Sequence, residues 1–223
     1  MRLLPLVPSA RAQPWNANAD TEGVQEAQRA ALARDGHTCR FCGFQAGGRQ
    51  GVVPLDSDTA NLASDNLATA CPLCEAVQDL GRPAAKLEML LVWLPEMTQA
   101  VLNSLVRGIH QVLHMEGQSP AQGTRPRKDT PAVRAAWRAY AALAGREQGA
   151  ELHLGTSSPL ELASALLDMP PSTYARRAAM LAGTRVLHRG RHFCDGADVY
   201  PAVLADWARA GVPVAVPAFP TLS

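Results

Sequence analysis

The sequence lacks three features that would place it in a specialised class of protein. It has no excess of charge, since 21 Lys and Arg residues face 20 Asp and Glu residues, and this excludes a uniformly basic nucleic-acid coat. It has no long apolar run, because the stretch Leu90–Leu94 falls far short of the roughly 18–20 residues that cross a membrane. Only five cysteines occur among 223 residues, too few for a disulfide scaffold. We therefore expect a cytoplasmic protein without membrane insertion, whose 47% of hydrophobic residues can form a core.

The spacing of apolar and helix-breaking residues predicts a mixed α+β fold. Residues 20–35 predict a helix that ends near Gly36, and residues 87–94 predict a buried strand that Pro95 stops. Thr98 can cap the next helix, in which apolar residues from Val101 to Leu113 recur at helical spacing. Further helices are expected at residues 131–146, 160–168, 172–181 and 198–210.

Four of the five cysteines have the spacing of a metal site. Cys39 and Cys42 are separated by two residues, as are Cys71 and Cys74, and 28 residues lie between the two pairs. Two such pairs can close a tetrahedral shell of four thiolates, which suits Zn²⁺, whereas a redox pair or a chance pattern is the alternative. A closed shell leaves no free coordination position. We therefore expect one structural zinc per chain, which orders residues 36–80 in a treble-clef arrangement of knuckle, hairpin and helix.

Several motifs around these cysteines resemble the IcmJ/DotN family. The segments that carry the resemblance are residues 37–45 (HTCRFCGFQ), 56–61 (DSDTAN), 65–71 (DNLATAC), 93–100 (WLPEMTQA) and 102–105 (LNSL). The resemblance is close over residues 30–110 and continues more weakly to the helix around Trp207. Members of this family are cytoplasmic components of type IVB secretion and related conjugation systems.

The resemblance implies both a fold and a role. The fold is an HNH-type nuclease core around zinc, and the role is that of a non-catalytic accessory subunit that binds a segment of the coupling-protein ATPase. Adaptor proteins belong to the same coupling complex, and the chain would reach the inner membrane through its partner. The expected segments are a zinc-binding domain with the long helix (1–115), a linker (116–130), a helical C-terminal part (131–210) and a Pro-rich tail (211–223).

The alternative is an HNH-type endonuclease or a nucleic-acid-binding zinc protein. An HNH site needs a histidine as general base and a second histidine as metal ligand, with an asparagine that positions the motif. Asn66 fits the asparagine, but Leu55 and Glu75 stand where the histidines are needed. Residues 36–75 also carry a net charge of −2, the wrong sign for binding phosphate. We therefore expect neither catalysis nor nucleic-acid binding.

Other polar residues have weaker functional interpretations. His110 and His114 are four residues apart on a helix, but no HExxH pattern surrounds them, and we expect surface or boundary positions. A metal site or a nucleophile built from His188, His192 and Cys194 is less favoured than an exposed loop. From Ser172 to His192 the chain has no acidic residue, and its five arginines are either a solvated surface or a patch for an acidic partner; they are Arg176, Arg177, Arg185, Arg189 and Arg191.

Apolar surfaces offer the remaining candidates for partner binding. The apolar face of the helix at residues 98–114 is interpreted as core, with a partner helix in a groove as the alternative. Trp93 and Trp207 are likewise expected in the core, although tryptophan is also a frequent anchor at interfaces.

Overall fold

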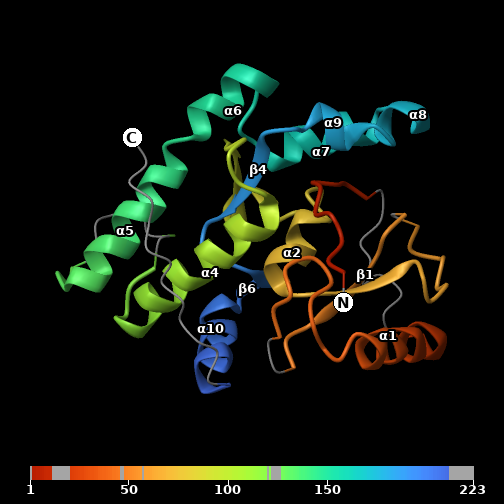
Figure 1. Ribbon diagram of the computed structural model, residues 1–223, viewed down its shortest axis with the longest axis horizontal. Coiled ribbons are helices and arrows are strands. Elements are labelled where there is room, and N and C mark those ends of the chain that lie inside the picture. The colour runs from red at the N-terminus through yellow and green to blue at the C-terminus, as the bar shows by residue number, and fades with distance from the viewer. Residues whose placement is uncertain are drawn as a thin grey trace. The chain divides into compact units, whose positions relative to one another are not determined.

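A computed structural model of the chain describes residues 2–11, 21–45, 48–56, 58–119, 121 and 127–210 (Figure 1). In these residues helices are combined with small antiparallel sheets of two strands each, so the expected α+β class is confirmed. The helices are α1 (Glu22–Arg34), α2 (Pro72–Val77), α3 (Ala85–Glu88), α4 (Gln99–Met115), α5 (Pro131–Ala144), α6 (Glu147–Leu154), α7 (Pro159–Leu167), α8 (Pro171–Tyr174), α9 (Arg177–Met180) and α10 (Tyr200–Arg209). The strands are β1 (Gly51–Pro54), β2 (Leu67–Ala70), β3 (Met89–Trp93), β4 (Thr184–His188), β5 (Phe193–Cys194) and β6 (Ala197–Asp198).

The chain divides into two compact units, and each unit is built from two separate stretches of sequence. Unit 1 comprises Met1–Ala85 and Pro159–Ala182, and unit 2 comprises Lys86–Ser158 and Gly183–Ser223. The segments expected from the sequence run continuously along the chain, and their independent folding stays a prediction. The expected Pro-rich tail lies outside the described residues, as does part of the expected linker, at residues 120 and 122–126.

Unit 1 is organised around the hairpin of β1 and β2. The two strands pair antiparallel, with Gly51 opposite Ala70 and Pro54 opposite Leu67. Helix α1 covers the hairpin, and its Ala31 packs with Val52 and Leu67 in a small core. Helix α2 follows β2 directly, so that strand, strand and helix form one continuous structure that carries the second cysteine pair.

The N-terminal segment is fastened to α2 by hydrogen bonds. The backbone N–H of Ser9 donates to the carbonyl of Val77, and the N–H of Leu80 donates to the carbonyl of Ser9. The Ser9 hydroxyl donates to the carbonyl of Gln78 at 2.8 Å, and the Gln78 side chain donates to Val7. Ser9 is fully buried, so this segment is an integral part of unit 1.

Unit 2 has a hydrophobic core between α4, α5 and the two-stranded sheet of β3 and β4. Helix α4 begins as expected, because the Thr98 hydroxyl accepts a hydrogen bond from the N–H of Val101. Its inward face includes Leu102, Val106 and Ile109, all of which are buried, so the interpretation of this face as core is confirmed. Val101 itself is exposed and was wrongly assigned to that face.

The C-terminal part, expected to be helical, contains α5 to α10, but residues 184–188 form strand β4, which was not expected. This strand pairs antiparallel with β3, which precedes the long helix, with Met89 opposite His188 and Trp93 opposite Thr184. The sequence TRVLH is short, and neither its length nor its alternation distinguishes it from loop. The expected helix at 172–181 is replaced by α8 and α9, and α6 was not expected as a separate helix.

No helix in the described part of the chain is both long enough and apolar enough to cross a membrane.

Candidate metal centre

The first cysteine pair lies on a tight turn that the local sequence stabilises. The N–H of Cys39 donates to the carbonyl of Phe44, and the N–H of Gly43 donates back to the carbonyl of Cys39, both at 2.9 Å. Gly43 has a φ of 74°, a conformation that glycine adopts without strain. A bridge between Thr38 and Gln45 closes the base of the turn. The two thiols are thereby held on the same side of the turn.

The second cysteine pair lies at the start of α2. Cys71 occupies the N-cap position, Pro72 is the first helical residue, and Cys74 follows within the first turn. Proline is favoured at this position because its missing N–H has no partner in a first turn. The N–H of Arg40 donates to the carbonyl of Thr69, which attaches the turn to β2 next to the helix. This backbone link brings the two pairs together.

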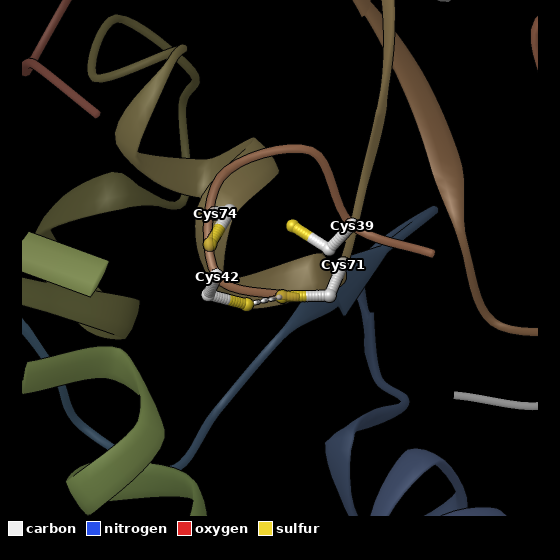
Figure 2. Close-up of side chains that lie close together, drawn as sticks. All are labelled: Cys39, Cys42, Cys71 and Cys74. Atoms are coloured by element: carbon white, nitrogen blue, oxygen red, sulfur yellow. Dashed lines mark hydrogen bonds between the residues drawn. The ribbon is translucent and has the colours of Figure 1, made fainter. Parts of the chain in front are cut away.

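The four sulfur atoms all lie within 4.8 Å of one another (Figure 2). The sulfurs of Cys42 and Cys71 are 3.7 Å apart. A tetrahedral zinc site with Zn–S bonds of about 2.3 Å requires sulfur–sulfur distances of about 3.8 Å. Three of the four cysteines are buried and Cys42 is half-buried. The donor chemistry, the distances and the burial therefore all fit Zn²⁺.

Hydrogen bonds among the four thiols shift their pKa values. Hydrogen bonds from Cys42, Cys71 and Cys74 hold the pKa of Cys39 well below its ordinary value. The pKa values of Cys71 and Cys74 lie well above the ordinary value, because both thiols bond to Cys39 and Cys42 and are buried. A divalent cation would stabilise all four thiolates and release the remaining protons.

Asp35 links three elements beside the cysteines, and sequence reasoning missed it. Its carboxylate pairs with Arg34 at 2.7 Å and with Arg40 at 3.1 Å, and it accepts the N–H of Thr69. Burial alone would raise the pKa of Asp35, but the hydrogen bonds from Arg34 and Thr69 lower it to about 2. An aspartate at the end of a predicted helix gave no sign of this role, because Thr69, the partner on β2, lies 34 residues away in sequence.

Asn66 lies where an HNH site would have its asparagine, and it secures the loop after β1. Its side-chain oxygen accepts from the N–H groups of Leu55 and Asp56, at 3.1 and 3.0 Å. Its amide nitrogen donates to the Asp56 carboxylate and to the carbonyl of Asn61, both at 2.9 Å. All of these hydrogen bonds are made within the protein, so the role of Asn66 is to hold the backbone of the loop that follows β1.

Glu75 occupies one of the positions where an HNH site needs a histidine. It faces β1 closely, since a Cβ added to Gly51 would come within 2.6 Å of its Oε2 atom. Burial raises the pKa values of Glu75 and of Asp79, and the nearby guanidinium groups of Arg11 and Arg82 partly offset that rise. Arg11 also donates to the carbonyl of Pro54. Two acids and two arginines therefore fill this position, and the contribution of Arg11 from the N-terminal segment was not foreseen.

The candidate histidines do not form a metal site in the described part of the chain. His110 is buried and its Nδ1 lies 2.8 Å from the Tyr200 hydroxyl, so the expectation of a surface or boundary position is wrong for it. Burial lowers the pKa of His110 to about 3. His188 is buried on β4, whereas Cys194 is exposed. Apart from the four cysteines, no group of three or more potential ligands comes together in the described residues.

The five arginines between residues 172 and 192 do not belong to one element or one unit. Arg176 and Arg177 lie in unit 1, and the other three lie in unit 2. The Arg185 guanidinium donates to the carbonyls of Met97 and Thr184, so its role is structural. The tryptophans are packed as expected: Trp207 is fully buried, and the half-buried Trp93 stacks on the His153 ring with 3.7 Å between centroids.

Comparison with known proteins relates the chain to a secretion apparatus. Over 97 residues it is 39% identical to the type 4 apparatus protein DotN of Legionella pneumophila. The match covers 41% of this chain and 44% of the length of DotN. No protein-family model matches the chain. The resemblance to the IcmJ/DotN family that the motifs indicate is therefore confirmed over the matched residues.

Proposed function

Because this chain is related to the IcmJ/DotN family over those 97 residues, we propose that it is a component of a type IVB secretion or conjugation apparatus. In this proposal it is an accessory subunit that binds a segment of the coupling-protein ATPase, alongside adaptor proteins of the same complex. It would work in the cytoplasm and reach the inner membrane through that partner. The identity to DotN is the observation that carries the proposal.

The metal centre gives this subunit its scaffold in our proposal. Cys39, Cys42, Cys71 and Cys74 bind one Zn²⁺, with the turn, the hairpin and α2 in a treble-clef arrangement of HNH-like type. The sulfur–sulfur distances and the enclosed thiols support this assignment. A zinc with four sulfur ligands has no open position for water or substrate, so its contribution is to the stability of unit 1.

A binding role is favoured over the nuclease role for two reasons. Leu55 and Glu75 replace the histidines that an HNH enzyme needs, and Asn66 bonds to the protein's own backbone. Leu55 cannot accept a proton, so the site lacks the general base that an HNH enzyme needs. The strand–strand–helix arrangement is the feature that keeps the nuclease as the second candidate, and a cleavage assay decides between them.

The proposal is tested with purified components. The full chain is mixed with the cytoplasmic region of the coupling ATPase encoded in the same genome, and the mixture is analysed by size-exclusion chromatography with light scattering. We expect a stoichiometric complex that buries on the order of 1,000–2,000 Å². A matched sample of the Cys71→Ser variant should bind weakly or not at all, because unit 1 is no longer ordered. Separate elution of the two wild-type proteins at micromolar concentration would overturn the proposal.

A further inference from the structure

Unit 2 contains a cavity of about 400 Å³, whereas the four cysteines belong to unit 1. It lies between α3, β3, the end of α5, the start of α6 and the segment that follows β4. Its volume is in the range of cavities that take small molecules or peptide side chains. The residues that line it are Leu87, Leu90, Ala121, Tyr140, Ala144, Glu147, Arg189 and Arg191.

One side of the cavity is apolar and partly open to solvent. Leu90 and Tyr140 belong to the hydrophobic core of unit 2, and Ala144 packs against that core. Leu87 is different, because 48% of its surface is exposed although it is a large aliphatic side chain. An exposed leucine that continues the wall of a cavity offers apolar surface to a bound partner.

The other side of the cavity carries two guanidinium groups that form no ion pair with a described residue. The guanidinium groups of Arg189 and Arg191 form no hydrogen bond or ion pair with any described residue, and the Nε of Arg189 is enclosed without a partner. Glu147 also lines the cavity, and its Oε1 accepts the Ser157 hydroxyl at 2.9 Å, so the two arginines and this carboxylate leave the lining with one net positive charge. The contrast with Arg185, whose guanidinium donates to two backbone carbonyls, indicates that Arg189 and Arg191 are available for an anion.

Tyr140 adds a third donor. Burial raises the pKa of Tyr140 to about 12, so the phenol remains protonated in the neutral range. Its hydroxyl makes no hydrogen bond to another residue in the described part of the chain. Two guanidinium groups and a phenol beside an apolar wall fit a carboxylate that is close to an aliphatic or aromatic side chain.

We infer that this cavity binds an acidic and apolar stretch of the coupling-ATPase segment, with a carboxylate at Arg189 and Arg191 and a neighbouring apolar side chain against Leu87 and Leu90. The inference rests on the proposed function and adds the anchoring site and the chemistry of the bound segment. Arginine and tyrosine at a partly enclosed position are typical of residues that dominate binding energy. Charge complementarity is the reason for an acidic occupant.

The experiment uses the full-length chain and the cytoplasmic region of the coupling ATPase, together with overlapping 15-residue peptides from that region. Affinities are measured by fluorescence anisotropy. We expect the tightest peptides to combine Asp or Glu with Leu, Ile or Phe. The double variant Arg189→Ala/Arg191→Ala should bind at least about ten-fold more weakly, as expected when charge-assisted hydrogen bonds are lost. The matched control Arg176→Ala/Arg209→Ala removes the same charge from exposed positions and should change the affinity by less than about two-fold.

A second variant tests the place of the site by adding a negative charge to its lining instead of removing the arginines. Leu87→Asp adds an anion at an exposed position, so folding should be unaffected while binding of the acidic peptides is lost. Unchanged zinc content and circular dichroism establish that each variant is folded. If the double variant and Leu87→Asp bind the ATPase region as tightly as wild type, the inference is overturned and the proposed function stands. If wild type binds neither the region nor its peptides, the proposed function itself fails.

Discussion

At the scale of single residues, Asp35 shows how a buried charge holds the metal-binding unit together. It pairs with Arg34 and Arg40 and accepts the N–H of Thr69, so one carboxylate joins α1, the cysteine turn and β2. Its pKa of about 2 lies below the ordinary value of 3.8. A lowered pKa means that the charged carboxylate stabilises the folded state.

We predict that Asp35→Asn lowers the free energy of unfolding by about 2 kcal/mol at pH 7, which is the free-energy equivalent of the lowered pKa. The contribution of Asp35 is complete above its ordinary value of 3.8 and is lost as the pH falls through about 2. Urea unfolding at pH 7, with the zinc content confirmed in both proteins, measures the difference between wild type and variant.

The control for this prediction is Asp129→Asn. Asp129 pairs with Arg134 at the surface, where ion pairs contribute little. Its replacement should cost less than about 0.5 kcal/mol. Equal costs for the two variants at pH 7 would contradict the role given to Asp35.

The residues at the HNH positions lead to a second prediction. Leu55 has no basic group where a nuclease has its histidine base, and Glu75 lies beside Arg11 and Arg82, so plasmid DNA should stay intact with Mg²⁺ or Mn²⁺. Agarose gels over several hours provide the measurement, with Asn66→Ala as the matched variant. Cleavage by wild type that disappears in Asn66→Ala would show that this site is catalytic after all.

At the scale of elements, the turn at residues 38–45 and the start of α2 meet at the four cysteines. We predict one zinc per chain in wild type, and loss of that zinc in Cys71→Ser, because three ligands bind the ion far less tightly than four. Binding energy on the order of 10 kcal/mol then no longer orders residues 36–80. Metal analysis and hydrogen exchange measure the two effects, and exchange in this segment should become fast.

Cys194→Ser is the control for the metal prediction, because Cys194 is exposed and is not part of the cysteine cluster. It should retain the zinc and its protection from exchange. A wild-type protein without stoichiometric zinc, or a Cys71→Ser protein with full zinc, would refute the assignment.

The two-stranded sheet of β3 and β4 depends on a close approach at Gly183. This glycine has a φ of 93°, and an added Cβ would come within 2.5 Å of the Trp93 ring. We predict that Gly183→Ala lowers the free energy of unfolding by about 3 kcal/mol, from backbone strain and displacement of the ring. Thermal or urea unfolding measures the effect.

Gly155→Ala separates these two causes. Gly155 also has a positive φ, 79°, but no atom lies within 4 Å of an added Cβ. Its replacement should cost only the strain, about 1 kcal/mol. If both variants lose the same stability, packing against Trp93 contributes nothing.

The parts of the fold that could be predicted from the sequence are those held together by residues close to one another along the chain. Helix α4 was predictable because its cap, Thr98, and its apolar spacing lie within one segment. The cysteine cluster was predictable because each pair sits on a short turn or a first helical turn. Strand β4 was not, because its partner β3 lies about ninety residues away and its own five residues have no distinctive pattern. Asp35 and Arg11 were missed for the same reason.

At the scale of the whole molecule, each unit is assembled from two distant stretches of chain. Residues 159–182 belong to unit 1 although they follow most of unit 2, and β4 returns the chain to unit 2. The segments expected from the sequence were consecutive, so they do not match units that are each built from two separate stretches of chain. The functional features follow the same division, because the cysteine cluster belongs to unit 1 and the cationic cavity belongs to unit 2.

The central claim is that this chain is a working part of a type IVB secretion or conjugation apparatus. The most direct test deletes its gene in the bacterium that encodes it and measures transfer of a substrate through that apparatus, by a reporter fusion or by conjugation frequency. We predict that transfer falls by at least about ten-fold, and that wild type restores it while Cys71→Ser does not. Transfer at the wild-type level in the deletion strain would contradict the account.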